Sequence, residues 1–235
     1  MGLGRATAIA LSKAGYEIAV VGRTLSKLEE TASIIGGRSL PIQAELTRPD
    51  EVRTAFAKID SAFGRLDALV NNAAAYRLCL METVTDAQVD EVIDGTLKAP
   101  IYCIREAISR MRAVGGGDIV NVSSETLRLP APYLLLYAAA KAGLECLTDG
   151  LRGELKGANI RFMVFQAGTM TESSSATGAE DHPELSKGFM DAFIGGGFAP
   201  HYTAGVTPQS MAATIAHMIT APKEAIIDLV RMRHA

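Results

Sequence analysis

The chain has 235 residues, of which 48% are hydrophobic and 21% charged, and its formal net charge is −3. This length suits one α/β domain with a sizeable core, and the near-neutral charge argues against nucleic acid or an anionic membrane as a partner. No apolar run reaches the roughly 18 residues of a membrane span, and the N-terminus lacks a signal-peptide core, so we expect a cytoplasmic protein.

Helical and strand patterns alternate along the chain. In order, the predicted elements are helix 5–14, strand 18–21, helix 26–36, strand 40–44, helix 47–64, strand 68–70, helix 86–111, strand 119–122, a helix carrying residues 137–141, strand 160–165, helix 209–220 and strand 225–230. Ser26 and Glu29 have the spacing of a capping box that starts a helix, and Pro100 predicts a kink.

This alternation predicts a doubly wound parallel sheet with helices on both faces, in one domain that covers residues 1–235. Ligands of such sheets bind beyond the carboxyl ends of the strands. Ser124, Asn71 and Gly168 all lie at such ends. Residues 169–208 are rich in Ser and Gly and weakly patterned, which predicts a lid or substrate loop.

A tyrosine and a lysine four residues apart, Tyr137 and Lys141, share one face of a helix and can meet in one site. An ammonium beside a phenol is expected to lower the pKa of the phenol, which suits proton transfer near neutral pH. Ser124, thirteen residues before Tyr137, can hold a reacting oxygen. The pair alone is a weak signal, and its weight comes from its surroundings.

With these residues the whole chain resembles the short-chain dehydrogenase/reductase family, nicotinamide-dependent oxidoreductases on a Rossmann fold. The matching stretches, in chain order, are Gly2-Leu3-Gly4, Asn71-Asn72-Ala73-Ala74, Ile119 to Ser124, Tyr137 with Lys141, and Gln166 to Thr171. The resemblance implies that Gly2, Leu3 and Gly4 approach a pyrophosphate at a helix N-terminus. It places the remaining cofactor contacts at Arg23, Glu45, Leu46, Asn71, Ala73, Tyr137, Lys141, Gly168, Thr169 and Thr171.

The choice of cofactor depends on the end of the second strand. Enzymes that use NAD place a carboxylate there for the ribose hydroxyls, and it would repel a 2′-phosphate. This chain has Gly22 and Arg23 instead, with Lys27 nearby, and a guanidinium suits a phosphate. NADP is therefore the expected cofactor, and NAD is the alternative.

Three departures from the family pattern stand out. The chain begins inside the glycine motif, so we expect the family's first strand to be missing and the strands at Ile18 and Ala68 to lack a neighbour. We therefore expect either that the natural product starts about 10–15 residues upstream of Met1 or that this chain is a fragment. Thr96 stands where the family has an asparagine of the proton relay, and Ala167 replaces a proline.

The expected activity is reversible hydride transfer between NADP(H) and a ketone or secondary alcohol. Tyr137 would be the general acid or base, Lys141 would lower its pKa, Ser124 would bind the substrate oxygen and Thr96 would sit in the proton relay. The alternative is a non-catalytic nucleotide-binding relative, or an inactive fragment, that acts through a partner. The family is mostly dimeric or tetrameric, so a homo-oligomer is expected.

The substrate itself is not specified by the sequence. Apolar residues at 127–136 and Met170, Phe189, Met190 and Phe193 suit either an apolar pocket or ordinary core and dimer contacts. The three cysteines fit no disulfide or metal spacing and are expected to be free, buried thiols. The scattered histidines predict no metal site.

Overall fold

The computed structural model describes residues 2–128, 130–171, 183–195 and 205–234. Its strands are β1 (Ile18–Gly22), β2 (Ser39–Gln43), β3 (Ala68–Asn71), β4 (Gly117–Ser124), β5 (Ile160–Ala167) and β6 (Leu229–Met232). Its helices are α1 (Leu3–Lys13), α2 (Leu25–Ile35), α3 (Pro49–Phe63), α4 (Asp86–Ile93), α5 (Ala99–Ala113), α6 (Leu135–Glu154), α7 (Pro183–Gly195) and α8 (Pro208–Thr220), with a π-helical turn η1 (Asp94–Lys98) and a 3₁₀ turn η2 (Glu125–Leu127).

All strand pairs are parallel, which confirms the predicted Rossmann-like α/β fold. The strands form two sheets, β1-β2 and β3-β4-β5-β6. The order agrees with a doubly wound sheet in which β1 and β3 lack a common neighbour, as expected. Residues 18–21 of β1 and 68–71 of β3 line one cavity instead of pairing with a strand between them.

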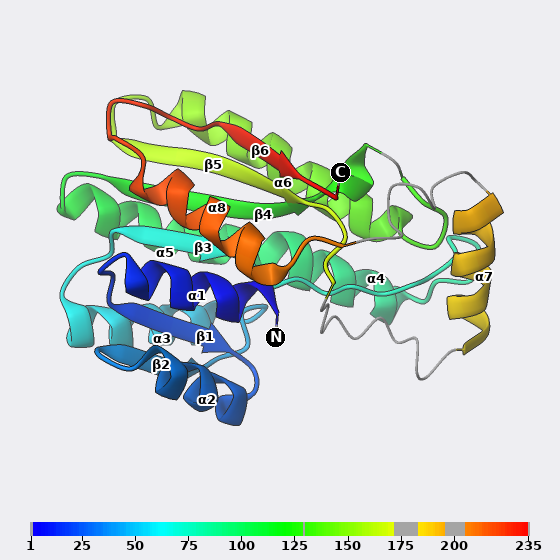
Figure 1. Cartoon of the computed structure of the whole chain (residues 1–235), viewed down its shortest axis with the longest axis horizontal. Coiled ribbons are helices and arrows are strands. Elements are labelled where there is room, and N and C mark those ends of the chain that lie inside the picture. The colour runs from blue at the N-terminus through cyan, green and yellow to red at the C-terminus, as the bar shows by residue number, and fades with distance from the viewer. Residues whose placement is uncertain (1, 129, 172–182, 196–204, 235) are drawn as a thin grey trace.

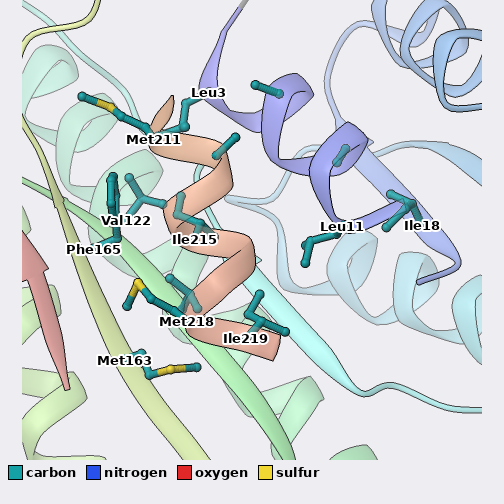
Figure 2. Close-up of a cluster of buried hydrophobic side chains, with 14 residues drawn as sticks. Leu3, Leu11, Ile18, Val122, Met163, Phe165, Met211, Ile215, Met218 and Ile219 are labelled. Carbon is teal, nitrogen blue, oxygen red and sulfur yellow. The ribbon is translucent and has the colours of Figure 1, made fainter. Parts of the chain in front are cut away.

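Helices cover both faces of the larger sheet (Figure 1): α1 and α8 lie on one face, and α5 and α6 lie on the other. The main core lies under α8, whose residues Met211, Ile215 and Met218 are fully buried and point toward β4 and β5 (Figure 2). Burying an Ile or Met side chain contributes roughly 1.5–3 kcal/mol. This core therefore fixes the strand ends at which Ser124 and Gly168 lie.

The start of α2 differs from the prediction. The helix begins at Leu25 after Thr24, and Ser26 lies inside it, so the capping box was wrong. Arg5 of α1 reaches across to this helix, where it pairs with Glu30 at 2.6 Å and donates to Thr31 Oγ1 at 3.0 Å. The position of α2 therefore depends on a contact between helices that local sequence does not encode.

The predicted helix at 86–111 is disturbed just before Pro100. Proline has no N–H and cannot donate to the carbonyl of residue i−4, here Thr96. The chain responds with the π-helical turn η1, in which Ala99 N–H donates to the carbonyl of Asp94. The disturbance was predicted as a kink, and the structure resolves it as a π-helical insertion between α4 and α5.

Three other expectations need correction. The last strand begins at Leu229 rather than at residue 225, because the carbonyls of Ala221, Pro222 and Ala225 turn toward the guanidinium of Arg161. The segment at 169–208 contains the helix α7, while its residues 172–182 and 196–204 lie outside the described residues. Cys79 and Cys103 are buried, but Cys146 is exposed.

Among the described residues, no helix is both long and apolar enough to cross a membrane.

Candidate active site

One cavity of about 1840 Å³ lies at the carboxyl ends of β3, β4 and β5 and extends into the space between β1 and β3. It is lined by most of the predicted site residues: Gly2, Leu3, Gly4, Arg23, Leu46, Asn71, Ala73, Ser124, Tyr137, Lys141, Gly168 and Thr169. Thr96, Glu45 and Thr171 do not line it. The residues predicted for proton transfer and those predicted for the cofactor therefore share a single space.

Lys141 lies at the floor of this cavity and is 1% exposed. Its ammonium donates to the carbonyl of Val122 at 2.6 Å, and Nζ lies 5.7 Å from the centroid of the Tyr137 ring. Burial lowers the pKa of Lys141 to about 8, although Glu145 opposes this shift. The strand β4 thus holds the ammonium through a backbone carbonyl, next to the phenol.

Burial also governs Tyr137. It raises the pKa of the phenol to about 12, while a hydrogen bond with Ser124 acts in the opposite direction. The expected lowering of this pKa by Lys141 was therefore wrong: desolvation disfavours the phenolate more than the hydrogen bond with Ser124 favours it. At neutral pH the phenol therefore keeps its proton, which is the form that a general acid needs.

The buried lysine predicts a specific pH dependence of stability. An unfolded lysine keeps its proton up to about pH 10.4, while folded Lys141 loses it near pH 8. Between these values the unfolded state binds more protons, so stability rises with pH. From pH 8 to pH 10 we expect the wild type to gain roughly 2 kcal/mol relative to Lys141→Met.

Denaturant unfolding of both proteins from pH 7 to pH 10 measures this difference. The pKa of Tyr137 is also raised, and this makes stability fall with pH near and above pH 10. Both proteins contain Tyr137, so this effect cancels in the comparison. If the difference in free energy of unfolding between the two proteins stays constant with pH, the folded lysine titrates with an ordinary pKa.

A second tyrosine, which the sequence did not single out, packs against Tyr137. The rings of Tyr76 and Tyr137 meet edge to face, with 5.1 Å between centroids and 66° between planes. Tyr76 lines the cavity just after Ala73 and Ala74. A single tyrosine in a loop carries no pattern, so only the fold reveals that it restrains the phenol.

A chain of buried amides and hydroxyls connects β3, β4 and α6. Asn71 Nδ2 donates to Asn121 Oδ1 at 2.8 Å, Asn121 Nδ2 donates to Thr148 Oγ1 at 2.8 Å, and Thr148 Oγ1 donates to the carbonyl of Leu144 at 2.7 Å. Asn71 thus braces β3 against β4 and α6 through Asn121 and Thr148. Asn121 and Thr148 were missed because a single polar residue in an apolar element is an ambiguous signal.

Thr96 is completely buried in η1. Its hydroxyl donates to the carbonyl of Ala75 and accepts from the N–H of the same residue, both at 3.1 Å. The side chain therefore fastens the loop after β3 to the helix. Both hydrogen bonds of the hydroxyl engage the loop backbone at Ala75.

The N-terminus of α1 opens into the cavity. Gly2 occupies the position before the helix, no side chain caps the first turn, and no acidic residue lies in it. A Cβ on Gly4 would lie 2.8 Å from Nδ2 of Asn72, so a larger residue at this position would have to displace that side chain. Free helix N–H groups and a small side chain suit a phosphate. These residues therefore fit the predicted dinucleotide.

Arg23 directly follows β1, and Glu45 lies two residues after the end of β2. Arg23 is exposed at the cavity, and within the described part of the chain its guanidinium forms no ion pair. Glu45 is engaged locally: its carboxylate accepts from Thr47 N–H at 3.2 Å, and its own N–H donates to Glu51 at 2.7 Å. The guanidinium of Arg23 is therefore available to bind an anion, whereas Glu45 forms hydrogen bonds within the loop after β2.

The segment after β5 is held by backbone hydrogen bonds. Gly168 N–H donates to the carbonyl of Met232 at 2.9 Å, Thr171 N–H donates to that of Val206 at 3.2 Å, and Val206 N–H donates to that of Thr169 at 2.9 Å. Gly168 and Thr169 thereby stay at the cavity, while Thr171 points out to solvent. Ala167 does not prevent this arrangement.

Helix α7 supplies an apolar wall. Phe189, Met190 and Phe193 line the cavity with Met170 and Leu134, whereas Leu127 and residues 135–136 do not. Tyr133 has a φ of 70°, and its ring packs edge to face on Phe189 at 6.5 Å between centroids. Leu129 lies outside the described residues. The apolar-pocket interpretation therefore applies mainly to α7.

Comparison with known proteins agrees with this site. The model of the family described as short chain dehydrogenase matches residues 1–183. The uncharacterized oxidoreductase YgfF of Escherichia coli is 35% identical over 188 residues, which cover 76% of each chain. The 3-oxoacyl-acyl-carrier-protein reductase FabG of Staphylococcus aureus is 36% identical over 163 residues, covering 68% of this chain and 66% of that one. A solved metagenomic short-chain oxidoreductase in complex with NADP has the same fold, with a TM-score of 0.81, 24% identity, and coverage of 100% of this chain and 93% of the other.

Proposed function

Because the chain belongs to the short-chain dehydrogenase family, we propose that it transfers a hydride reversibly between NADP(H) and a ketone or secondary alcohol. The observation that carries this proposal is the meeting of Ser124, Tyr137 and Lys141 in one cavity with the glycines at the start of α1. The family membership makes the protein an oxidoreductase, and the choice of NADP and of the substrate belongs to the proposal.

The residues divide between two tasks. Gly2, Leu3 and Gly4 hold the pyrophosphate, Arg23 holds the 2′-phosphate, and Leu46, Asn71, Ala73, Gly168 and Thr169 border the rest of the dinucleotide. Glu45 and Thr171, which do not line the cavity, are assigned no contact with it. The cofactor, when bound, supplies or accepts the hydride at the carbon that carries the reacting oxygen.

Proton transfer is the work of the chain's own side chains. In reduction, Tyr137 gives its phenolic proton to the substrate oxygen as that oxygen gains negative charge, and in oxidation it takes the proton back. Ser124 donates a hydrogen bond to the same oxygen and stabilises the developing alkoxide. Lys141 stabilises the phenolate by its charge, and Thr96 contributes its carbonyl to the path that returns a proton.

The cofactor assignment is tested by fluorescence titration of NADPH and NADH into the purified protein. We expect NADPH to bind more tightly, because the guanidinium of Arg23 can form charge-assisted hydrogen bonds with a 2′-phosphate. Replacing Arg23 by Glu is expected to weaken NADPH binding roughly 10- to 150-fold and to leave NADH binding nearly unchanged.

The matched control is Arg53→Glu, which changes the net charge of the protein by the same amount as Arg23→Glu. Arg53 is an exposed residue of α3 and does not line the cavity. Equal losses for both cofactors, or equal effects of both variants, would refute the role of Arg23. NADPH binding without reduction of any ketone would favour the alternative of a non-catalytic nucleotide-binding protein. The homo-oligomer, the cytoplasmic location and the lid at 169–208 stay predictions.

A further inference from the structure

Unpartnered polar atoms gather immediately around Ser124. Ser123, Glu125 and Thr126 line the cavity and are only 2%, 2% and 5% exposed. Among the described residues, Ser123 Oγ, Glu125 Oε2 and Thr126 Oγ1 have no hydrogen-bond partner. A buried polar group without a partner costs about 1–3 kcal/mol. Of these three atoms, Glu125 Oε2 lies beside Gly168 at the cavity, so it points to a ligand that carries a matching donor.

Of the three residues, Glu125 lies next to Ser124 in the chain and beside Gly168 in space. It begins the turn η2, whose start is capped by the hydrogen bond from Thr126 N–H to Ser124 Oγ at 3.3 Å. Its Oε2 lies 3.0 Å from the place that a Cβ on Gly168 would occupy. The carboxylate therefore lies between the serine that binds the reacting oxygen and the end of β5, where glycine leaves room for it.

The charge of Glu125 is already balanced. Arg233, at the end of the chain, lies 3.6 Å from Oε1 and is about half exposed. A carboxylate offers about four acceptor sites on its two oxygens, so Oε2 retains its capacity to accept hydrogen bonds. Because the ion pair supplies the compensating cation, a neutral hydroxyl fits this position better than an ammonium group.

On the basis of the proposed function, we infer that Glu125 is a substrate-binding residue that accepts a hydrogen bond from a second hydroxyl group near the reacting carbon. The preferred substrate class is then hydroxy ketones and vicinal diols rather than plain ketones. Phe189, Met190 and Phe193 of α7 line the apolar part of the same cavity.

The test compares acetoin with 2-butanone, which lacks only the hydroxyl group, as substrates for NADPH-dependent reduction. The wild type is expected to prefer acetoin by at least about 10-fold in kcat/KM, because one hydrogen bond to a charged group is worth about 1.5–3 kcal/mol. Glu125→Leu is expected to lower this preference roughly 10- to 150-fold, and Glu125→Gln, which keeps an acceptor, to restore part of it.

Arg233→Ala is the matched control, since it removes the ion pair and keeps the carboxylate. If Glu125 serves only to anchor the chain end, both variants will lose thermal stability alike and the preference for acetoin will not change, which overturns the inference. A loss of NADPH affinity in Glu125→Leu, measured by titration, would assign the carboxylate to the cofactor's carboxamide N–H and also overturn it. A higher kcat/KM for 1-amino-2-propanone than for acetoin would show that the site prefers an ammonium group to a hydroxyl group. This result would also contradict the inference.

These outcomes are distinct from failure of the proposed function. Absence of ketone reduction by the wild type, despite NADPH binding, would refute the oxidoreductase proposal itself. Reduction of both ketones at equal rates would leave that proposal standing and refute the role of Glu125.

Discussion

Tyr137→Phe is expected to lower kcat for ketone reduction by about 10²- to 10⁴-fold, the usual contribution of a positioned general acid. Phenylalanine keeps the ring and its edge-to-face contact with Tyr76, whose centroid lies 5.1 Å away, and removes only the hydroxyl that transfers the proton. The affinity for NADPH should change little. Steady-state kinetics with a saturating ketone, together with cofactor titration, measure both quantities.

Tyr133→Phe is the control for this experiment, because it deletes the phenol of a tyrosine on the same segment that does not line the cavity. It should retain most of the wild-type kcat. Turnover by Tyr137→Phe within a few-fold of the wild type would remove Tyr137 from the reaction and leave only a structural role.

Arg161→Ala is expected to produce the largest loss of stability. The guanidinium is buried and donates to Asp118 at 2.6 Å and to the carbonyls of Ile219 and Ala225 at 2.8 and 2.9 Å. Asp118 is 1% exposed. Without Arg161, a buried carboxylate and several carbonyls lose their donor, which costs about 3–5 kcal/mol. For a chain of this length the melting temperature should fall by roughly 6–20 °C.

Lys223→Ala provides the comparison, since Lys223 binds the other oxygen of Asp118 at 2.5 Å but its side chain is 66% exposed. We expect it to cost about 1 kcal/mol or less, as exposed ion pairs do. Calorimetry of both variants distinguishes a buried network from a surface one. Equal effects of the two substitutions would mean that water replaces the guanidinium without penalty.

The periodic features of the fold were accessible from the sequence. Alternating apolar runs and helical faces depend on local residue order, so β1 to β5 and most helices were predicted to within a few residues. The features that failed depend on distant partners. Arg161 turns the chain before β6 through carbonyls about 60 residues away in sequence, and Arg5 fixes α2 from another helix.

The site shows the same division. The helical spacing of Tyr137 and Lys141 and the place of Ser124 at a strand end predicted that these residues meet, and the resemblance to the family supplied the weight that spacing alone lacks. The contact of Tyr76, the link from Asn121 to Thr148 and the unpartnered oxygen of Glu125 arise only when separate segments meet. The pKa of Tyr137 was misjudged because desolvation is a property of the packed cavity, which sequence spacing does not report.

The division of the strands into β1-β2 and β3-β6 has a mechanical consequence. Arg23 belongs to the first group, whereas Ser124 and Tyr137 belong to the second, and among the described residues no strand ladder joins the groups. Side-chain packing joins them instead, since α1 and β1 share a core with β4, β5 and α8, and a dinucleotide held at both ends would add a second connection. Its binding energy would resist their separation, because a ligand that binds only the assembled form stabilises that form by mass action. In this protein the cofactor would therefore serve as a structural tie as well as a reactant.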